Sequence, residues 1–222
     1  MNCAFAVDGI LCISLRERED RRMLLAETLD CLNAEVEFLL VERDVEDSQR
    51  GCFKSHQKCA ELMLDRGWSR VLILEDDVLF NTFDCEAVTR VNNYLRRYEP
   101  PVFYLGIMLG KLWPTWSKGV AACRAQGTHA YILSAEAAEV VVAERYCKQG
   151  IDTFIKRRFP GRTAFPMLCQ QQPESVGKSD LDFWRMGDTV KDEVFWQRNY
   201  KKQYFEWWRN IYKLFYFSWL KF

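Results

Sequence analysis

The amino-acid sequence predicts an α/β fold in which a largely parallel sheet is covered by helices. The first observation is an alternation of short apolar runs, of strand length, with amphipathic stretches of helical length. The second is composition: the 222 residues are 49% hydrophobic and 28% charged, which suits a folded globule and excludes a disordered or collagen-like chain. The third is an apolar run that ends abruptly in three acidic residues, as expected where a strand reaches a ligand site.

The first half of the chain supplies three expected strands, each followed by an expected helix. The strands are expected at 10–15, 36–41 and 71–74, and the helices at 17–32, 51–66 and 86–98. The second helix has apolar residues at helical spacing and a glycine, Gly67, where it should stop. The third helix ends before Pro100 and Pro101, because proline cannot continue a helix.

The second half continues the pattern with shorter runs. Strands are expected at 102–107, 129–133 and 163–168, a helix at 135–147, and a tryptophan-rich loop at 111–118. For Trp113 and Trp116 we leave open a platform for an acceptor sugar and simple burial, because indole rings stack on sugar faces and also fill cores. No internal repeat or low-complexity linker is visible, so residues 1–191 are expected to form one domain.

Charged and aromatic residues divide the chain into an acidic body and a basic tail. Basic and acidic residues both number 31, and this zero balance argues against a protein that holds nucleic acid through bulk positive charge. Residues 195–222 contain six basic residues, one acidic residue and 13 aromatic rings. The rings recur at spacings of three and four, which predicts an aromatic amphipathic helix over 192–222. We favour peripheral contact of this helix with a membrane surface over packing on the body or on a partner subunit.

The nine cysteines have irregular spacings and include no C-x-x-C pair. Neither a zinc knuckle nor a disulfide framework is indicated, and reduced thiols in a cytoplasmic protein are the simpler interpretation. The amino-terminal residues have no basic region before their apolar stretch, so a secretory signal is not expected. No uncharged run reaches the length needed to span a bilayer.

The acidic triplet Glu75-Asp76-Asp77 follows the apolar run at 71–74 directly. Ligands of open parallel sheets lie beyond the carboxyl ends of the strands. A cation bound there reduces the repulsion between neighbouring carboxylates. Oxygen ligands of this kind suit Mg²⁺ or Mn²⁺, usually shared with nucleotide phosphates. Because side chains alternate along an extended backbone, Glu75 and Asp77 can face the same side. The alternative is a solvated acidic turn.

Four blocks of residues together carry a family resemblance. They read ISLREREDRR at 13–22, GCFKSH at 51–56, LEDD at 74–77 and GTHAYILS at 127–134. In this order they resemble glycosyltransferase family 25, whose pattern is I-N-L with R-x-x-R-R, then G-C-x-x-S-H, L-E-D-D and G-x-x-A-Y. The resemblance runs from about 10 to 180, and Ser14 departs from it where the family usually has Asn. A short, cysteine-rich version of this kind is similar to copies carried by large DNA viruses.

The resemblance implies a GT-A-like, Rossmann-type single domain and a metal-dependent hexosyltransferase. The donor would be a nucleotide sugar, commonly a UDP-sugar, and the acceptor a glycan, a lipid-linked glycan as in lipopolysaccharide biosynthesis, or a protein. Asp77 would be the first metal ligand and a catalytic residue, Glu75 would hold the metal or the ribose, and Asp76 would belong to the same donor site. The Mn²⁺ or Mg²⁺ ion would neutralise the diphosphate leaving group.

The resemblance also assigns basic and histidine residues to the donor site. Ser14 and three arginines, Arg16, Arg18 and Arg21, lie where the first strand enters its helix and would hold nucleotide or phosphate. The alternative for the arginines is pairing with nearby acids on a solvated helix face. His56 would serve the nucleotide site or the structure, and His129 would face the acceptor or the metal.

Two further residues complete the predicted site. Asp152 is a candidate base for the acceptor's proton, and an N-cap of the following helix is its alternative role. Lys178, in the block SVGKSD at 175–180, would approach the diphosphate when its loop closes. Whether the reaction inverts or retains the sugar configuration stays open.

Two other functions remain compatible with the same acids. One is a different metal-phosphate enzyme, a nucleotidyltransferase or phosphohydrolase. The other is a catalytically inactive relative that binds a membrane or a partner, which would have no need to keep three mutually repelling acids.

Overall fold

A computed structural model describes residues 4–80, 84–173 and 192–219. Eight strands form the main sheet: β1 (Gly9–Leu15), β2 (Glu37–Val41), β3 (Arg70–Glu75), β5 (Val102–Tyr104), β6 (Met108–Pro114), β7 (Val120–Gln126), β8 (Ala130–Ser134) and β9 (Gly161–Ala164). The helices are α1 (Glu19–Leu29), α2 (Ser48–Asp65), α3 (Cys85–Tyr98), α4 (Ala135–Ala143), α5 (Ile151–Arg158) and α6 (Glu193–Trp219), with a 3₁₀ turn at Asp30–Leu32. Two short strands, β4 (Val78–Phe80) and β10 (Cys169–Gln171), pair separately.

The main sheet has the strand order β2-β1-β3-β8-β5-β9-β7-β6. Strands β1, β2 and β3 pair in parallel, as do β5 and β9, whereas β8 and β7 are antiparallel to both of their neighbours. The other six strands therefore share one direction. The predicted α/β class is confirmed, and the two reversed strands make the sheet mixed.

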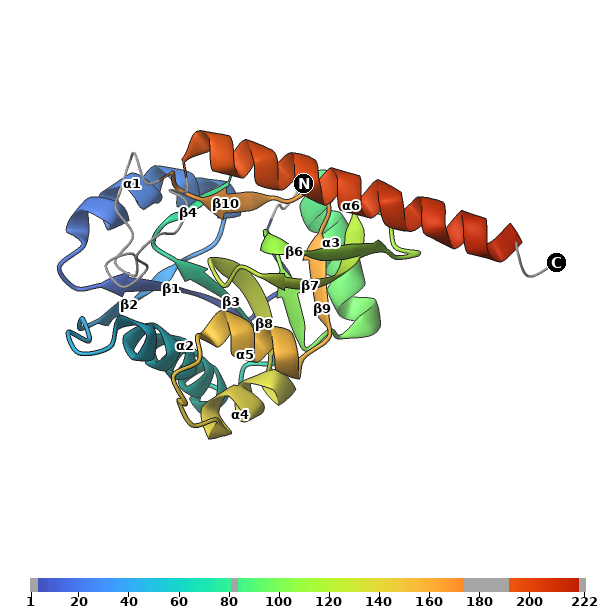
Figure 1. The fold of residues 1–222 in the computed structure, drawn as a ribbon. Coiled ribbons are helices and arrows are strands. Elements are labelled where there is room, and N and C mark those ends of the chain that lie inside the picture. Colours follow the sequence, from blue (N-terminus) through green and yellow to red (C-terminus); the bar gives the residue numbers. More distant parts are fainter. Residues whose placement is uncertain (1–3, 81–83, 174–191, 220–222) are drawn as a thin grey trace.

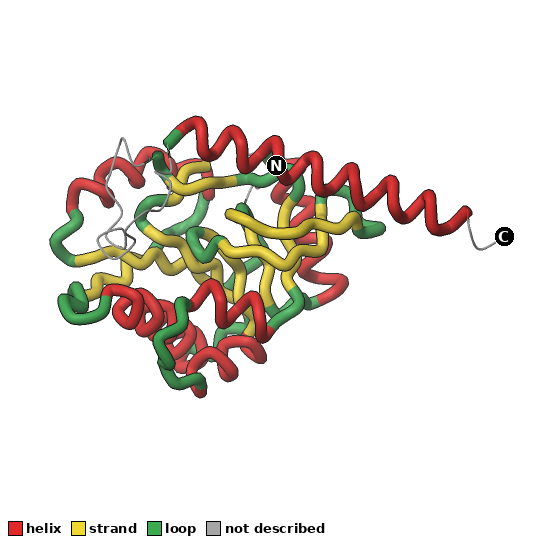
Figure 2. The backbone as a smooth tube through the Cα atoms, in the orientation of Figure 1, coloured by secondary structure: helices red, strands yellow, loops and turns green. Residues whose placement is uncertain are grey.

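Helices lie on both faces of the sheet, and each face has its own apolar core (Figures 1 and 2). In β3, Ile73 belongs to the core under α2, α4 and α5, whereas Leu72 and Leu74 belong to the core under α1 and α3. This alternation follows from the period of two along an extended strand. It explains why residues 71–74 read as a continuous apolar run, since both faces of β3 are buried.

The carboxyl ends of β1 and β3 lie side by side because the two strands are parallel and in register. Ile13 pairs with Glu75, and on the other side of β1 Leu15 pairs with Val41. The acidic triplet therefore leaves the sheet beside the turn that leads into α1. The head of α2 follows the end of β2 and completes the same corner of the molecule (Figure 1).

The tail helix α6 packs on the body along the edge strand β6. Its buried positions are Trp196, Asn199, Gln203, Glu206 and Asn210, which are mostly polar and recur every three or four residues. Asn199 and Gln203 donate to the carbonyl of Ile107 at 3.1 and 2.8 Å, and Asn210 donates to Leu112. Backbone carbonyls at a sheet edge need donors, and these amides supply them. The tail is thus held by a polar seam, which the aromatic spacing did not predict.

Several expectations from the sequence are wrong in detail. Residues 111–114 of the tryptophan-rich loop expected at 111–118 belong instead to strand β6, and strand β7 was not foreseen. Strand β7 is rich in alanine, and its buried Ala121, Cys123 and Ala125 face the packed core. Small residues of this kind carry little strand signal, because their preference arises from the neighbours they pack against. Of the expected strand at 163–168, only residues 163 and 164 lie in a strand, β9; a cis Phe165–Pro166 bond follows, and β10 begins later, at Cys169.

Seven described cysteines are free thiols: Cys12, Cys31, Cys52, Cys59, Cys123, Cys147 and Cys169. Cys85 is disulfide-bonded, which differs from the reduced state expected for it. In the described part of the chain, no helix combines the length and apolarity that crossing a bilayer requires.

Candidate functional site

A cleft of about 710 Å³ opens at the carboxyl ends of β1, β2 and β3, beside the head of α2. The predicted site residues that line it are Ser14, Arg21, His56, Glu75, Asp76 and Asp77. They come from three segments that are far apart in the sequence. Parallel pairing of β1 with β3 brings them together, because it places both strand ends at one edge of the sheet.

Glu75 is the last residue of β3 and the most constrained acid of the triplet. Its Oε1 atom accepts a hydrogen bond of 2.9 Å from the Thr128 hydroxyl and lies 3.3 Å from Nε2 of His56. Burial alone would raise the pKa of Glu75, but contact with His56, the charges of His56 and His129, and the Thr128 hydroxyl together lower the pKa to about 2. Glu75 is therefore a carboxylate at neutral pH.

Asp76 faces away from its neighbours and pairs with α1. Its Oδ1 atom accepts a hydrogen bond of 2.8 Å from Nη1 of Arg21, and both side chains are only 8% exposed. Arg21 and Asp76 were both predicted to contact the donor. The structure shows instead that they neutralise each other within the wall of the cleft.

Asp77 begins the turn into β4. Its backbone carbonyl accepts a hydrogen bond of 2.6 Å from the amide of Gln172, and its Oδ2 atom accepts a longer one of 3.3 Å from Gln171. These two hydrogen bonds hold the turn between β3 and β4 against β10 and the residue that follows it. Asp77 lines the cleft together with Glu75.

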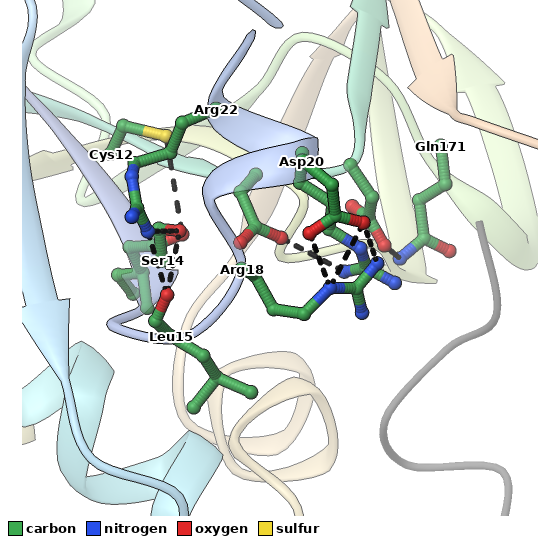
Figure 3. A network of polar contacts seen from close by, with 11 residues as sticks. Cys12, Ser14, Leu15, Arg18, Asp20, Arg22 and Gln171 are labelled. Carbon is green, nitrogen blue, oxygen red and sulfur yellow. Dashed lines mark hydrogen bonds and ion pairs between the residues drawn. The ribbon is translucent and has the colours of Figure 1, made fainter. Parts of the chain in front are cut away.

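The arginines after β1 have different partners (Figure 3). Arg18 is bidentate to Asp20, which lowers the pKa of that carboxyl to about 2, mainly through the hydrogen bonds to Arg18. Arg16 pairs with Glu42, and neither Arg16 nor Arg18 is among the residues that line the cleft. The alternative weighed for the arginines, pairing with nearby acids on the helix face, is thus found for Arg18 alone, since Arg16 and Arg21 pair with acids of other segments.

Arg22 holds the end of β1 in shape, a role that sequence reasoning missed. Its Nη1 donates to the Ser14 hydroxyl at 3.0 Å and to the Leu15 carbonyl at 2.7 Å, and its Nη2 donates to the Arg16 carbonyl at 3.0 Å (Figure 3). Ser14 is buried, and its hydroxyl also donates to the Leu15 carbonyl. The sequence block at 13–22 does contain this residue, because its final Arg-Arg pair is Arg21 and Arg22, and it could have drawn attention to Arg22.

Both histidines are buried. His56 contacts the Tyr131 hydroxyl through Nδ1 at 3.0 Å and faces the cleft from α2. His129 lies at the start of β8, where its ring stands edge-on to Trp196 at 6.0 Å between centroids. His129 is not among the residues that line the cleft, although its charge contributes to the lowered pKa of Glu75.

Asp152 acts on the loop that carries Thr128. Its Oδ1 atom accepts hydrogen bonds from the backbone amides of Gly127 and Thr128 at 3.0 and 2.9 Å. The N-cap of α5 is Gly150, so the capping role weighed for Asp152 is wrong. Asp152 lines a neighbouring cavity, which also includes Cys52 and Tyr146.

Two predicted elements lie away from the cleft or outside the described residues. Lys178 and its block at 175–180 lie outside the described residues. The hairpin of β6 and β7 has its base at Met108 and Gln126, next to the Thr128 loop, and its tip at Trp116. Seven residues at about 3.3 Å each place that tip about 20 Å from the base. Such a distance does not favour Trp113 and Trp116 as the acceptor platform.

Four contact residues near the cleft were not singled out from the sequence: Cys52, Thr128, Tyr131 and Gln171. Cys52, Thr128 and Tyr131 lie within the blocks at 51–56 and 127–134, so the motifs contained them without indicating their contacts. Gln171 has no sequence signal, because only the pairing of β10 with β4 brings it to Asp77.

The buried pair of Arg21 and Asp76 predicts a large, recoverable effect on stability. Arg21→Met leaves a buried carboxylate without its cation and should lower the free energy of unfolding by about 3–5 kcal/mol in urea denaturation at pH 7. Adding Asp76→Asn should recover most of that loss. Arg16→Met, which breaks the pair with Glu42 whose two side chains are 61 and 76% exposed, should cost about 1 kcal/mol or less. Equal losses for the two single variants would contradict the assignment.

One family model matches a segment that contains two of the four sequence blocks, those at 51–56 and 74–77. The model of glycosyltransferase family 25, described as LPS biosynthesis protein, matches residues 40–99, a segment that contains α2, β3 and the acidic triplet. No curated protein matches the chain.

The chain is also similar to solved structures of low sequence identity. A protein from STIV is 14% identical over 73% of this chain and 83% of that chain, with a TM-score of 0.48. Mannose-1-phosphate geranyltransferase from Thermus thermophilus is 14% identical over 74% of both chains, with a TM-score of 0.45. A glycosyltransferase involved in the glycosylation of the major capsid of PBCV-1 is 12% identical over 60% of this chain and 63% of that chain, with a TM-score of 0.37.

Over residues 40–99, the family match confirms the predicted resemblance to glycosyltransferase family 25 and, with it, the predicted enzyme class of glycosyltransferase.

Proposed function

We propose that this protein is a metal-dependent glycosyltransferase that moves a sugar from a nucleotide sugar, with a UDP-sugar as the favoured donor, to a glycan, lipid-linked glycan or protein acceptor. The observation that carries the proposal is the cleft at the carboxyl ends of β1 and β3, where Glu75 and Asp77 face a common space within the segment that matches the family. Asp76 is neutralised by Arg21, so two carboxylates remain for ligand binding.

The donor atoms of the cleft fit a hard divalent cation. Asp77 and the ionised Glu75 present carboxylate oxygens, the ligands that Mg²⁺ and Mn²⁺ prefer when they are shared with phosphates. Such an ion supplies charge neutralisation for a diphosphate leaving group. Asp77 is the proposed principal ligand, and Glu75, whose Oε1 accepts from Thr128, is the proposed second ligand. Ser14 and His56 also line the cleft and are the proposed contacts for the nucleotide.

Asp77→Ala should abolish transfer while leaving the fold intact, because it removes the proposed principal ligand without touching a core contact. We expect transfer from UDP-sugar in the presence of Mn²⁺ to fall by about 100-fold or more. A screen of UDP-, GDP- and CMP-sugars for thermal stabilisation first identifies the donor. Asp65→Ala, which removes an exposed acid at the end of α2, is the matched control and should keep full activity.

Full activity of Asp77→Ala with Mn²⁺ would overturn the site assignment. The products separate glycosyl transfer from the other metal-phosphate reactions: sugar transfer releases nucleoside diphosphate, whereas nucleotidyl transfer releases pyrophosphate. Calorimetry that detects no metal-dependent nucleotide binding would favour an inactive relative.

Asp152 is the proposed base, and its contacts allow a clean test. In Asp152→Asn the amide oxygen can still accept from Gly127 and Thr128, so the loop should keep its position. If Asp152 takes the acceptor's proton, transfer should fall by about 10²–10⁴-fold with little change in stability. Transfer at the parent rate would limit Asp152 to holding the loop, and Asp152→Ala would then reduce both stability and activity.

We also propose that the exposed face of α6, in the tail at 192–222, contacts an anionic membrane surface beside the catalytic domain. Phe205, Trp208 and Tyr212 are 65, 60 and 68% exposed, on the side away from the polar seam. Exposed basic residues accompany them: Lys201, Lys202, Arg209 and Lys213. Aromatic rings at headgroup level with cations on anionic lipid are typical of interfacial helices.

Flotation with vesicles tests this contact. The full chain should float with vesicles containing phosphatidylserine and much less with neutral phosphatidylcholine vesicles. Trp208→Ala should reduce flotation several-fold, whereas Trp116→Ala removes a still more exposed indole on the β6–β7 hairpin and should leave flotation unchanged. Equal effects of the two variants, or no flotation of the parent chain, would contradict the proposal.

A further inference from the structure

Three potential metal ligands of different chemical type converge beside the cleft. Cys52 and His56 lie one turn apart on the same face of α2, and Glu75 ends the neighbouring strand β3. The Cys52 thiol, a His56 ring nitrogen and a Glu75 carboxylate oxygen all lie within 4.8 Å of one another. An ion with tetrahedral coordination and bonds of 2.0–2.3 Å needs ligand atoms about 3.5 Å apart. Side-chain movements of about 1 Å would therefore close the set around one ion.

The surroundings orient two of these ligands toward the common point. Tyr131 contacts Nδ1 of His56 at 3.0 Å, so in the tautomer with a proton on Nδ1 the tyrosine hydroxyl accepts it and Nε2 presents a lone pair. Thr128 donates to Oε1 of Glu75, and Asp152 in turn holds the Thr128 backbone. Ligands that bind metals are commonly fixed in this way by a second layer of hydrogen bonds.

The buried imidazole nitrogen gives an independent indication of a ligand. His56 is 1% exposed, and its Nε2 atom has no hydrogen-bond partner among the described residues, because the 3.3 Å approach to Glu75 lacks hydrogen-bond geometry. A buried polar atom left without a hydrogen-bond partner destabilises the fold, because it has lost its contacts with water and gained none in return. A cation between Nε2 and the carboxylate would satisfy the nitrogen and balance the charge of Glu75.

We propose that Cys52, His56 and Glu75 bind a thiophilic divalent cation, with Zn²⁺ as the best match. A thiolate, an imidazole and a carboxylate form a donor set that suits Zn²⁺ and does not suit Mg²⁺, which prefers oxygen ligands alone. Three protein ligands leave a fourth position for water or substrate. Cys52 lines both the cleft and the neighbouring cavity, so that position is accessible from either side.

This site differs from the proposed donor metal at Asp77 in chemistry and in most of its ligands. The donor metal would use carboxylate oxygens and nucleotide phosphates, whereas the new site requires the Cys52 thiolate and His56. Glu75 lies between them and has two carboxylate oxygens, so the two sites can share it. The new site does not depend on the glycosyltransferase proposal, and its test needs no sugar donor.

Cobalt substitution tests the site on the full chain without measuring activity. After chelator treatment, one equivalent of Co²⁺ should give a thiolate-to-cobalt charge-transfer absorption and strong visible bands of tetrahedral Co²⁺, and Zn²⁺ should bleach both. Cys52→Ala should abolish the charge-transfer absorption. Cys31→Ala removes another half-buried free thiol and should leave the spectrum unchanged. Charge-transfer absorption that persists in Cys52→Ala, or a weak spectrum of octahedral Co²⁺ in the parent chain, would overturn the proposal.

Two further variants separate this site from the donor metal. Tyr131→Phe removes only the hydroxyl that orients His56 and should weaken Co²⁺ binding by about 10–100-fold while the form of the spectrum is kept. Asp77→Ala should abolish sugar transfer and leave the cobalt spectrum intact. Loss of the spectrum in Asp77→Ala would mean that Asp77 is a ligand of the same ion, which contradicts the proposed set.

Discussion

Electrostatic repulsion within Glu75-Asp76-Asp77 is the constraint on which the site depends. Three adjacent carboxylates at the end of a buried strand are tolerated only if each is placed in a different environment. Glu75 turns toward His56 and Thr128, Asp76 toward Arg21, and Asp77 toward Gln171 at the edge of the cleft. Each partner comes from a different element, so the triplet ties α1, the Thr128 loop and β10 to the end of β3.

The same arrangement explains why the cleft is acidic without being unstable. The buried pair of Arg21 and Asp76 removes one negative charge from the wall, and the histidines beside Glu75 keep this second, half-buried carboxylate ionised. The carboxylates of Glu75 and Asp77 remain at the cleft, and their charge favours a cation there. Asp152 supports this arrangement indirectly, because it accepts a hydrogen bond from the backbone of Thr128, whose hydroxyl donates to Glu75.

The tail shows how a sheet edge can set the orientation of a helix. The aromatic spacing of α6 predicts a helix whose rings define its contacts, yet the residues that face β6 are mainly amides. Asn199 and Gln203 satisfy the carbonyl of Ile107, which the apolar side chains of the tail could not do. Trp196, Tyr204 and Trp207 still pack on the body, whereas Phe205, Trp208 and Tyr212 lie exposed on the outer face.

The sequence by itself determined the alternation of strands and helices, the position of the acidic triplet and the family blocks, because long apolar periodicities and ordered motifs are local properties of the chain. The tertiary structure alone decided which strands are reversed, that residues 108–114 form a strand, and which partner each acid takes. These depend on contacts between distant residues, such as Arg21 with Asp76 and Thr128 with Glu75. No local pattern records them, since a pairing partner is selected by where the sheet brings its strands together.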